Sequence, residues 1–478
     1  MQFNLGNSYT IVTNATPEEE ALLHQWCNKE YEYYGLDFSQ KPPRRMKMVS
    51  KLPYFKYNKF PSGWTGKFLQ RLRKDPAKAA NSEYVTFKDV RHKANGSPIP
   101  MTLTPGYNVP ELRDYQDRAL KAAIKSSRGI IHHATGAGKT VVTAAILAEL
   151  GLPSLIVVPT LNLLIQTAED LKGFLGEDFV GEIGEGVFNP KLFTVATVQS
   201  LWSKIKRNDE DLSNLFKVID VLCIDEAHHI NVAGKNKIQN TYFQIAMMLD
   251  CYYKFGLTAT PGDPESLERE LLEGATGRVI DHVSSSELIK RGLLTRPEIQ
   301  MYKIHPPQRY SDWQAAYKQN ILRNGKRNAQ IVRLAEQYSA QDKSVLITVT
   351  RVEEHGGLLN DMIPEAVFMS GKTPADERKQ ILEDFGNKKV KVLISTVVNE
   401  GVNIPSMDVI IMAGGGKSNK QTVQRVGRAL RKSEGKSKAM IIDFYDADNG
   451  MLERHSKARL KTYKKESEFE INPIIEID

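Results

Sequence analysis

"ATGAGKT" (134–140) places a lysine and a hydroxyl directly after two closely spaced glycines. Gly136 and Gly138 permit backbone angles that other residues resist, so the N–H groups of this loop can point inward around an anion. The positive end of a following helix favours a phosphate at that place. Lys139 can then reach the β- and γ-phosphates of a nucleotide, and the Thr140 hydroxyl can bind Mg²⁺.

One residue departs from the usual pattern of such loops. His133 stands where the strict pattern G-x-x-x-x-G-K-[ST] has its first glycine, so a plain tight turn is the alternative. The remaining residues keep the spacing of a phosphate loop, which favours nucleotide binding. The predicted nucleotide contacts are Thr135, Gly136, Ala137, Gly138, Lys139 and Thr140.

Two carboxylates follow an apolar run in "VIDVLCIDEAHH" (218–229). Ligands of open α/β sheets bind at the carboxyl ends of strands. We expect Asp225 to hold the Mg²⁺ that Thr140 also contacts, and Glu226 to polarise the water that attacks the γ-phosphate. The alternative is an acidic loop at a strand end, but an acidic strand end after a phosphate loop favours the metal-binding assignment.

These side chains need a scaffold, and the chain from about residue 109 alternates short apolar runs with helical stretches. The runs "RGIIHH", "SLIVV", "LFTVAT" and "VIDVLCI" are typical of buried parallel strands. A second series follows from about residue 344, with "SVLITVT", "AVFMS", "VKVLIST", "DVIIMA" and "KAMIIDF". The segment 311–337 between the two series is predicted to be helical. The alternation predicts an α/β class with two doubly wound parallel sheets.

The first 108 residues have a different composition. Lysines and arginines recur from Lys41 to Lys74 without an acidic residue. Interleaved with them are Tyr54, Phe55, Tyr57, Phe60 and Trp64. Cations can meet phosphates while aromatic rings stack on bases, so this stretch predicts nucleic-acid contact. The alternative is a solvated basic face over a small aromatic core. Residues 93–110 are rich in Gly and Pro and predict a linker. The cations chosen as candidate DNA contacts are Arg44, Arg45, Lys47 and Lys51.

Bulk composition narrows the class of protein. The 478 residues suggest about three domains of ~150 residues each. A net charge of +8 favours a polyanionic partner. Three scattered cysteines suit a reducing compartment and no metal site. The sequence has no apolar run of ~18 residues and no basic-then-apolar signal at its start, so we predict a cytoplasmic protein without a membrane span.

Further motifs occur in order along the chain. They are "LRDYQ" (112–116), "VVPTLNLLIQ" (157–166), "TVQS" (197–200), "LTATP" (257–261), "STVVNEGVNIP" (395–405) and "QRVGRALR" (424–431). With "DEAH" (225–228), the set resembles that of superfamily 2 DEAH-box helicases over roughly residues 109–450. Within that superfamily, "RNAQI", "NEGVNIP" and the tail "HSKARLKTYKKESEFEI" look most like phage UvsW-type branch-migration DNA helicases.

The resemblance implies roles for matched residues of the first sheet domain and for strand contacts in both. Gln116, with Arg113, would read adenine through its amide. His228, Thr258 and Thr260 would couple the state of the nucleotide to the nucleic acid. Contacts to a nucleic-acid backbone are predicted for Pro159, Thr160, Gln166, Thr197, Gln199, Thr350, Arg351, Ser370, Gly371 and Thr396. Taken singly, threonines such as Thr197, Thr350 and Thr396 could equally be sheet residues.

The second sheet domain is expected to complete the ATP site. By resemblance, Arg428 and Arg431 would meet the γ-phosphate, Gln424 would assist them, and Gly401 would contact the nucleotide. For Arg425, a surface or strand-contacting position is as good an interpretation as a phosphate role. ATP would then close the cleft between the domains and hydrolysis would reopen it, which would move the protein along a strand.

The resemblance also implies a fold and an activity. The fold is two RecA-like domains, 109–284 and 285–450, preceded by a small basic α+β domain (1–108) and followed by a helical tail (451–478). The activity is ATP- and Mg²⁺-dependent unwinding of forks and Holliday junctions, with 3′-to-5′ polarity, in recombination, repair or replication. A monomer is expected, with branched DNA and a single-strand-binding protein as candidate partners, in the host cytoplasm if a phage encodes it.

Three other functions remain open. An RNA helicase would use the same chemistry, because the predicted strand contacts fall mostly on phosphates. A restriction or defence motor would need a nuclease signature, and none is evident outside the motor. A non-catalytic DNA-binding scaffold conflicts with the intact Lys139, Glu226 and Arg428.

Overall fold

The computed structural model describes residues 1–37, 44–52, 54–74, 86–93, 96–231, 241–306, 308–396, 407–416, 426–427, 430, 436 and 438–477. The chain divides into two compact units. The first consists of Met1–His133 and Gly138–His282, and the second of Ala134–Ala137 and Val283–Asp478. Each unit has its own parallel sheet and its own buried core.

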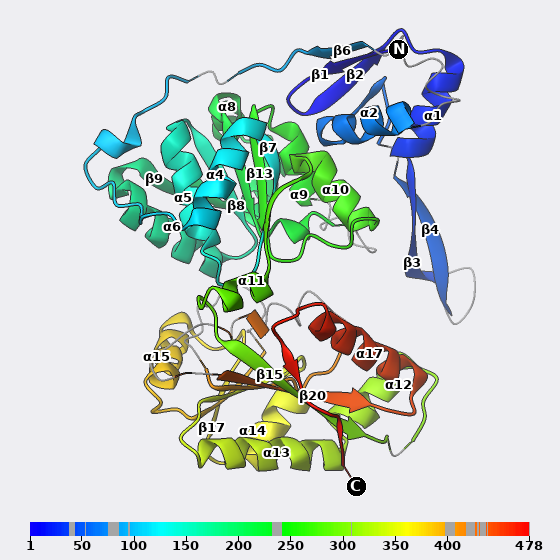
Figure 1. Cartoon of the computed structure of the whole chain (residues 1–478), viewed down its shortest axis with the longest axis vertical. Coiled ribbons are helices and arrows are strands. Elements are labelled where there is room, and N and C mark those ends of the chain that lie inside the picture. Colours follow the sequence, from blue (N-terminus) through cyan, green and yellow to red (C-terminus); the bar gives the residue numbers. More distant parts are fainter. Residues whose placement is uncertain are drawn as a thin grey trace. The chain divides into compact units, whose positions relative to one another are not determined.

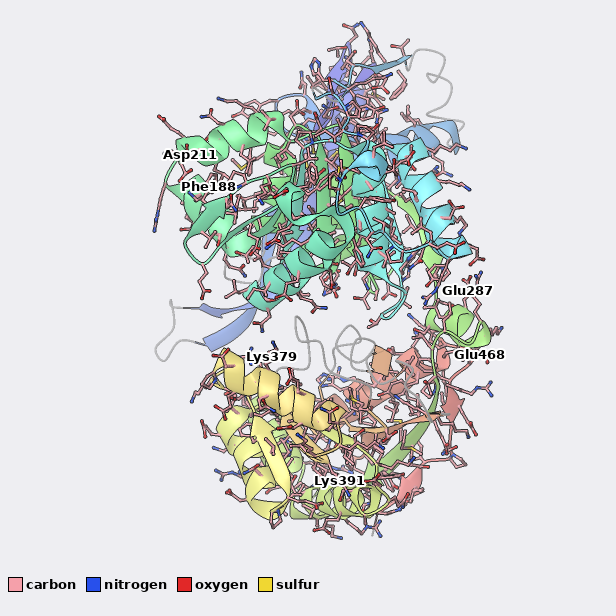
Figure 2. All side chains as sticks on the ribbon, turned by 90° about the vertical axis from the view of Figure 1, so that its left-hand side faces the viewer. Phe188, Asp211, Glu287, Lys379, Lys391 and Glu468 are labelled. Carbon is pink, nitrogen blue, oxygen red and sulfur yellow. The ribbon has the colours of Figure 1, made fainter. Side chains whose placement is uncertain are left out.

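The first unit is built on an eight-stranded sheet in the order β10-β9-β11-β8-β12-β13-β7-β14. Its strands are β7 (Arg128–His133), β8 (Ser154–Val158), β9 (Val180–Gly184), β10 (Val187–Asn189), β11 (Phe193–Thr197), β12 (Val221–Asp225), β13 (Tyr253–Thr258) and β14 (Val279–Val283). The pairs from β9 through β7 are parallel, and β10 at the end runs antiparallel to β9. Phe188 of β10 and Asp211 of the nearby helix α8 mark this end of the unit in Figure 2.

Helices cover both faces of this sheet, as a doubly wound fold requires (Figure 1). The helices are α4 (Asp114–Ser126), α5 (Lys139–Leu150), α6 (Leu161–Leu175), α7 (Val198–Lys206), α8 (Glu210–Val218), α9 (Thr241–Met248) and α10 (Leu267–Thr276), with short turns η4 (Glu177–Phe179) and η5 (Ala227–His229). One core joins α4, α5 and α6 to one face, and a second core joins α7 to α10 to the other. Every strand before a site loop is therefore held on both sides, which fixes the loops at its end.

The N-terminal residues form a small α+β body with its own four-stranded sheet, β5-β2-β1-β6. Its elements are β1 (Gln2–Leu5), β2 (Tyr9–Thr13), α1 (Pro17–Cys27), β5 (Lys59–Pro61), η1 (Ser62–Trp64), α2 (Thr65–Lys74) and β6 (Thr86–Asp89). Strands β3 (Lys29–Asp37) and β4 (Arg44–Leu52) pair with each other as a separate two-stranded ribbon. The region thus contains both helices and strands, in keeping with the α+β prediction.

This body is attached to the first sheet through a common core. Phe3, Phe60 and Trp64 belong to the same buried cluster as Leu271 of α10. The Trp64 indole N–H donates to the backbone carbonyl of Glu270 at 2.6 Å. A Cβ atom on Gly63 would lie 1.8 Å from the backbone carbonyl oxygen of Glu273. The glycine is thus required for this close approach.

Buried polar contacts also join the N-terminal body to β13. The ammonium of Lys254 donates to Ser8 Oγ at 2.8 Å and to the Ala246 carbonyl at 2.7 Å. Burial lowers the pKa of Lys254 to about 8. The predicted linker also packs on this unit, since Met101 of η3 (Met101–Leu103) is buried in the core beside α5.

The second unit carries another parallel sheet, in the order β17-β18-β16-β19-β20-β15-β21, with β22 also paired to β15. Its strands are β15 (Arg296–Ile304), β16 (Val345–Thr348), β17 (Ala366–Met369), β18 (Val392–Ser395), β19 (Val409–Ile411), β20 (Lys438–Asp446), β21 (Glu470–Ile471) and β22 (Ile475–Glu476). The five predicted strands are confirmed as β16 to β20. β15 was not predicted, although it forms a long parallel pair with β20.

Helices of the second unit are α11 (Ser285–Lys290), α12 (Trp313–Tyr317), α13 (Gly325–Ser339), α14 (Leu358–Met362), α15 (Ala375–Gly386) and α17 (Gly450–Lys464), with π-helical turns η7 (Lys318–Leu322) and η8 (Val352–Gly357). The predicted helical segment 311–337 is thus confirmed in the main. The predicted helical tail is helical only in α17, because the residues after it form β21 and β22 on β15. Glu468, labelled in Figure 2, precedes these strands and forms an ion pair with Arg296 at 2.9 Å.

Candidate functional site

The predicted phosphate loop joins β7 to α5. Gly136 and Gly138 have φ angles of 85° and 77°, in the left-handed region that glycine alone adopts readily. Helix α5 begins at Lys139 with no side-chain cap and no acidic residue in its first turn. Its first N–H groups and its dipole therefore favour an anion at this end, as the sequence predicted. Thr135 and Thr140 are half-buried, Gly136 is exposed and Ala137 is buried.

The predicted adenine-contacting residue lies beside this loop. Gln116 is buried in the first turn of α4, and its amide oxygen accepts from the Arg113 N–H at 3.0 Å. A Cβ on Gly138 would lie 2.6 Å from the amide nitrogen of Gln116, so the two segments are in close contact. The Arg113 guanidinium donates to the Tyr115 hydroxyl at 3.1 Å. The structure thus brings Gln116 and Arg113 to the phosphate loop.

Asp225 is the last residue of β12, and Glu226 follows it at the same edge of the sheet. Burial and the neighbouring Glu226 raise the pKa of Asp225 to about 6, while the charge of Lys139 acts in the opposite direction. Two carboxylates that disfavour each other's charge beside a single lysine suit a divalent cation, whose oxygen ligands are carboxylates and hydroxyls. Asp225 and Thr140 therefore fit a Mg²⁺ site. Glu226 has φ 47° and ψ 47°, a strained backbone for a non-glycine residue.

The three predicted coupling residues form one contact chain with Glu226. His228 Nδ1 lies 3.2 Å from the Glu226 carboxylate and 3.0 Å from Thr258 Oγ1. The Thr260 N–H in turn donates to Thr258 Oγ1 at 3.1 Å. Because β12 and β13 are parallel neighbours, their ends bring these residues together. A displacement of the "LTATP" segment would therefore reach the carboxylate of Glu226 through one histidine.

The predicted strand-contacting residues of the first unit also lie on this edge. The hydroxyls of Thr160 and Thr197 cap α6 and α7, accepting from Leu163 N and Ser200 N at 3.3 Å each. The Gln199 amide donates to the Pro159 carbonyl at 2.9 Å and joins the two loops. Neither helix has an acidic residue in its first turn. Gln166 is half-buried on α6.

In the second unit, the corresponding residues follow three adjacent strands. Thr350 and Arg351 come after β16, Ser370 and Gly371 after β17, and Thr396 after β18. These strands are parallel neighbours, so their carboxyl ends form one edge. Thr350, Arg351 and Gly371 are exposed, Ser370 is buried and Thr396 is half-buried.

Several residues that sequence reasoning missed hold the loop after β19. The Tyr317 hydroxyl bonds to Thr350 Oγ1 and donates to the Gly414 carbonyl. Arg459 of α17, fully buried, donates to the Gly416 carbonyl at 2.7 Å and to Asp443 at 2.8 Å. Arg327 donates to the carbonyl of Ala413 at 3.3 Å. Each contact joins segments far apart in the chain, so no local pattern indicates it.

The predicted residues Gly401, Gln424, Arg428 and Arg431 lie outside the described residues, as does Arg425. The described neighbours Val426 and Leu430 are buried, and the Leu430 carbonyl accepts from the Thr295 N–H at 2.8 Å.

Part of the N-terminal basic stretch lies on the two-stranded ribbon. Arg44, Arg45, Lys47 and Lys51 all belong to β4, whose side chains lie outside the described ones. Across the ribbon, Glu30 pairs in register with Lys51, and Asp37 with Arg44.

Aromatic residues and cations farther along the same stretch face inward. Phe55, Phe60 and Trp64 are buried, so for these the core alternative is correct and base stacking is wrong. Lys67 forms an ion pair with Glu270 at 2.8 Å. Tyr57, in contrast, is 79% exposed.

The described part of the chain contains neither a candidate membrane span nor a clustered metal site. None of its helices is long and apolar enough to cross a bilayer. Nor do the described residues include a cluster of three or more His, Cys, Asp or Glu side chains arranged to hold a metal ion.

Comparison with known proteins adds independent support. Residues 110–263 match the family "Type III restriction enzyme, res subunit", and residues 326–433 match "Helicase conserved C-terminal domain". The chain is 30% identical over 373 residues to the DNA 3'-5' translocase XPB2 of Sulfurisphaera tokodaii, covering 70% of this chain and 81% of that protein. It is 24% identical to the ATP-dependent DNA helicase uvsW of Enterobacteria phage T4, covering 70% and 68%.

Among solved structures, the DUF1998 helicase MrfA bound to DNA superposes with a TM-score of 0.55 at 18% identity, covering 80% of this chain and 53% of MrfA. That likeness shows the fold, two RecA-like domains. Together with the ordered motifs at the sheet edges, these matches confirm the predicted superfamily. The chain belongs to the superfamily 2 helicases and is an ATP-hydrolysing helicase.

Proposed function

We propose that the chain is an ATP-driven DNA translocase that unwinds and remodels branched DNA with 3′-to-5′ polarity. The observation that carries this proposal is the first sheet's carboxyl edge. There α5, α6 and α7 begin without acidic residues, beside a carboxylate pair. Such an edge suits a triphosphate at one helix and a nucleic-acid backbone at the other two. The similarity to XPB2, a DNA translocase, and to uvsW, a DNA helicase, supports DNA as the substrate.

The first unit would bind the nucleotide. The loop 134–140 would surround the phosphates, and Gln116 with Arg113 would contact adenine. Thr140 and Asp225 would hold Mg²⁺, which neutralises phosphate charge when bound. Glu226 would orient and polarise the attacking water, because its carboxylate follows directly after the metal-binding strand end.

The second unit would supply the remaining cations. Arg428 and Arg431 would stabilise the charge that develops on the γ-phosphate. Gln424 would assist these arginines, and Gly401 would contact the nucleotide. Neither unit would then hydrolyse ATP efficiently alone. The rate of hydrolysis would therefore depend on closure of the cleft between the two domains.

Coupling would run through the contact chain of the first unit. His228 touches both Glu226 and Thr258, so the geometry of the catalytic carboxylate would change with the "LTATP" segment. The strand contacts would be Pro159, Thr160, Gln166, Thr197 and Gln199 in this unit and Thr350, Arg351, Ser370, Gly371 and Thr396 in the other. Because Thr160 and Thr197 already cap helices, their contribution would come from the helix N–H groups they orient.

The basic ribbon would hold the duplex arms of a junction through Arg44, Arg45, Lys47 and Lys51. The working form would be a monomer in the cytoplasm, or in the host cytoplasm if a phage encodes it. A single-strand-binding protein would be a partner on the displaced strand.

One assay tests the substrate. Forks, Holliday junctions, 3′- and 5′-tailed duplexes and an RNA duplex are compared with and without ATP. We expect ATP-dependent unwinding of forks and junctions, and of 3′-tailed but not 5′-tailed DNA. Equal activity on the RNA duplex would favour an RNA helicase, and ATP hydrolysis with translocation but no unwinding would favour a restriction-type motor.

A further inference from the structure

The histidine that breaks the strict phosphate-loop pattern is wholly buried. His133 ends β7 and is 0% exposed, and its Nε2 lies 2.7 Å from Asp281 Oδ2. Asp281 belongs to β14, the neighbour of β7 at the end of the sheet. His133, which stands in place of the usual glycine, therefore contacts the neighbouring strand β14 through its side chain.

Asp281 also binds the helix that carries Gln116. Arg118 Nε donates to Asp281 Oδ1 at 2.6 Å, and its terminal nitrogen donates to the His282 carbonyl at 3.1 Å. Burial alone would raise the pKa of Asp281, but the bonds from His133 and Arg118 outweigh it and lower the pKa. The group is thus an ionised carboxylate with a partner on each oxygen, a strong and directional arrangement.

Asp281 is consequently a junction between three parts of the nucleotide site. Through His133 it reaches the strand before the phosphate loop, and through Arg118 it reaches α4 two residues beyond Gln116. Along its own strand it lies two residues before Val283, whose carbonyl accepts from the Ala134 N–H at 3.0 Å.

We propose that Asp281, through His133 and Arg118, is a positioning residue that fixes the adenine-contacting helix α4 against the phosphate loop. This rests on the proposed adenine role of Gln116. Loss of Arg118 would let α4 shift, while the contact of Asp281 with His133 would keep the phosphate loop in place. The selectivity for ATP over GTP would then fall, and the catalytic step would be little affected.

The variant of choice is Arg118→Gln, because its side chain is 49% exposed and its removal leaves no new cavity in the core. Asp281→Asn is the second variant, which keeps the shape and removes the charge. Lys172→Gln is the matched control: it breaks another helix-to-strand ion pair of the same unit, with Glu182 at 2.5 Å, away from the nucleotide loop. Gln116→Ala is the reference for a protein that no longer recognises adenine.

Affinities for ATP and GTP are measured directly with fluorescent analogues, and KM and kcat are measured for both nucleotides. We expect Arg118→Gln to raise Kd and KM for ATP about fivefold or more, with kcat within about twofold and a matching loss of ATP-over-GTP preference. Combining it with Gln116→Ala should reduce the preference little further, because both act on the same adenine contact.

Two results would overturn the proposal. One is unchanged nucleotide preference in Arg118→Gln and Asp281→Asn; the other is an equal loss in Lys172→Gln. If Gln116→Ala itself leaves the preference unchanged, the adenine role of Gln116 fails instead, and the two failures are distinguishable.

Discussion

The two parallel sheets have the same strand order, but several of the helices that follow their strands begin with different charges. In the first sheet, α5, α6 and α7 start without an acidic residue. In the second, η8 starts with Glu353 and Glu354, and α15 with Asp376 and Glu377. An acidic first turn already interacts with the positive end of the helix dipole, so the N–H groups of η8 and α15 suit a phosphate less well than those of α5, α6 and α7. The same fold thus offers three helix N-termini to phosphates in the first unit, whereas phosphate contacts from the second would come from the side chains and loops that precede its helices.

The largest effect on ATP hydrolysis is expected from the loss of Lys139 at the first edge. Lys139→Ala should abolish ATP hydrolysis, by about 10³-fold or more, because its ammonium charge acts on Asp225 and would contact the β- and γ-phosphates. The melting temperature should stay within a few degrees, because this half-buried loop residue adds little to the core. Near-normal turnover in a folded variant would refute the nucleotide assignment of this edge.

The second edge, by contrast, should act through arginines and not through helix N-termini. Arg428→Ala and Arg431→Ala together should reduce hydrolysis by on the order of 10³-fold. Nucleotide binding, measured by equilibrium titration, should persist because the first unit supplies it. Normal turnover in the double variant would show that the second unit does not complete the site.

A substitution at Glu226 tests whether this residue activates the attacking water or binds the metal ion. Glu226→Gln should lower kcat by on the order of 10²-fold, because an amide cannot polarise water as a carboxylate does. Affinity for Mg²⁺-ATP should remain, since Asp225 and Thr140 are intact. A collapse of affinity would make Glu226 a metal ligand.

The basic ribbon extends the comparison to a region outside both edges. Charge reversal of Arg44, Arg45, Lys47 and Lys51 should weaken junction binding about tenfold. The slope of log affinity against log salt should become shallower by roughly 0.9 for each phosphate that the protein no longer neutralises. ATP hydrolysis stimulated by short single strands should survive. Unchanged junction affinity would identify a solvated face, and equal loss on single strands would place the ribbon on the motor's own track.

The smallest effect tests the first-turn charges themselves. Asn162→Glu places a carboxylate in the first turn of α6, where it should stabilise the helix yet repel phosphate. Single-strand affinity should fall about two- to fivefold while ATP affinity is unchanged. Asp376→Asn, at the equivalent second position of α15, is the control and should not weaken binding. A variant that binds as tightly as the wild type would remove α6 from the strand contact.

Much of this organisation is readable from the sequence because it is local. Glycine spacing, an acidic strand end and apolar runs such as β16 and β18 depend on neighbours in the chain. Strand β15 contains no continuous apolar run, because Glu298 and Gln300 alternate with Ile299 and Met301. Such alternation is typical of a half-buried strand, but the prediction rested on continuous apolar runs. Asp281 and Tyr317 act only through distant partners, so the sequence holds no signal for them.

Aromatic content misleads for the same reason. Four aromatic residues between Lys41 and Lys74 are buried in the core, namely Phe55, Phe60, Trp64 and Phe68. In the same stretch, Lys67 forms an ion pair with Glu270 of α10. Local composition therefore predicted the presence of a small basic domain better than the use of its side chains.

The core that Phe3, Phe60 and Trp64 share with Leu271 also limits how this enzyme can be dissected. A fragment beginning at the first helicase motif would expose the apolar flank of α10 to water and leave the Lys254 ammonium without Ser8 as an acceptor. Such a minimal motor should aggregate on expression.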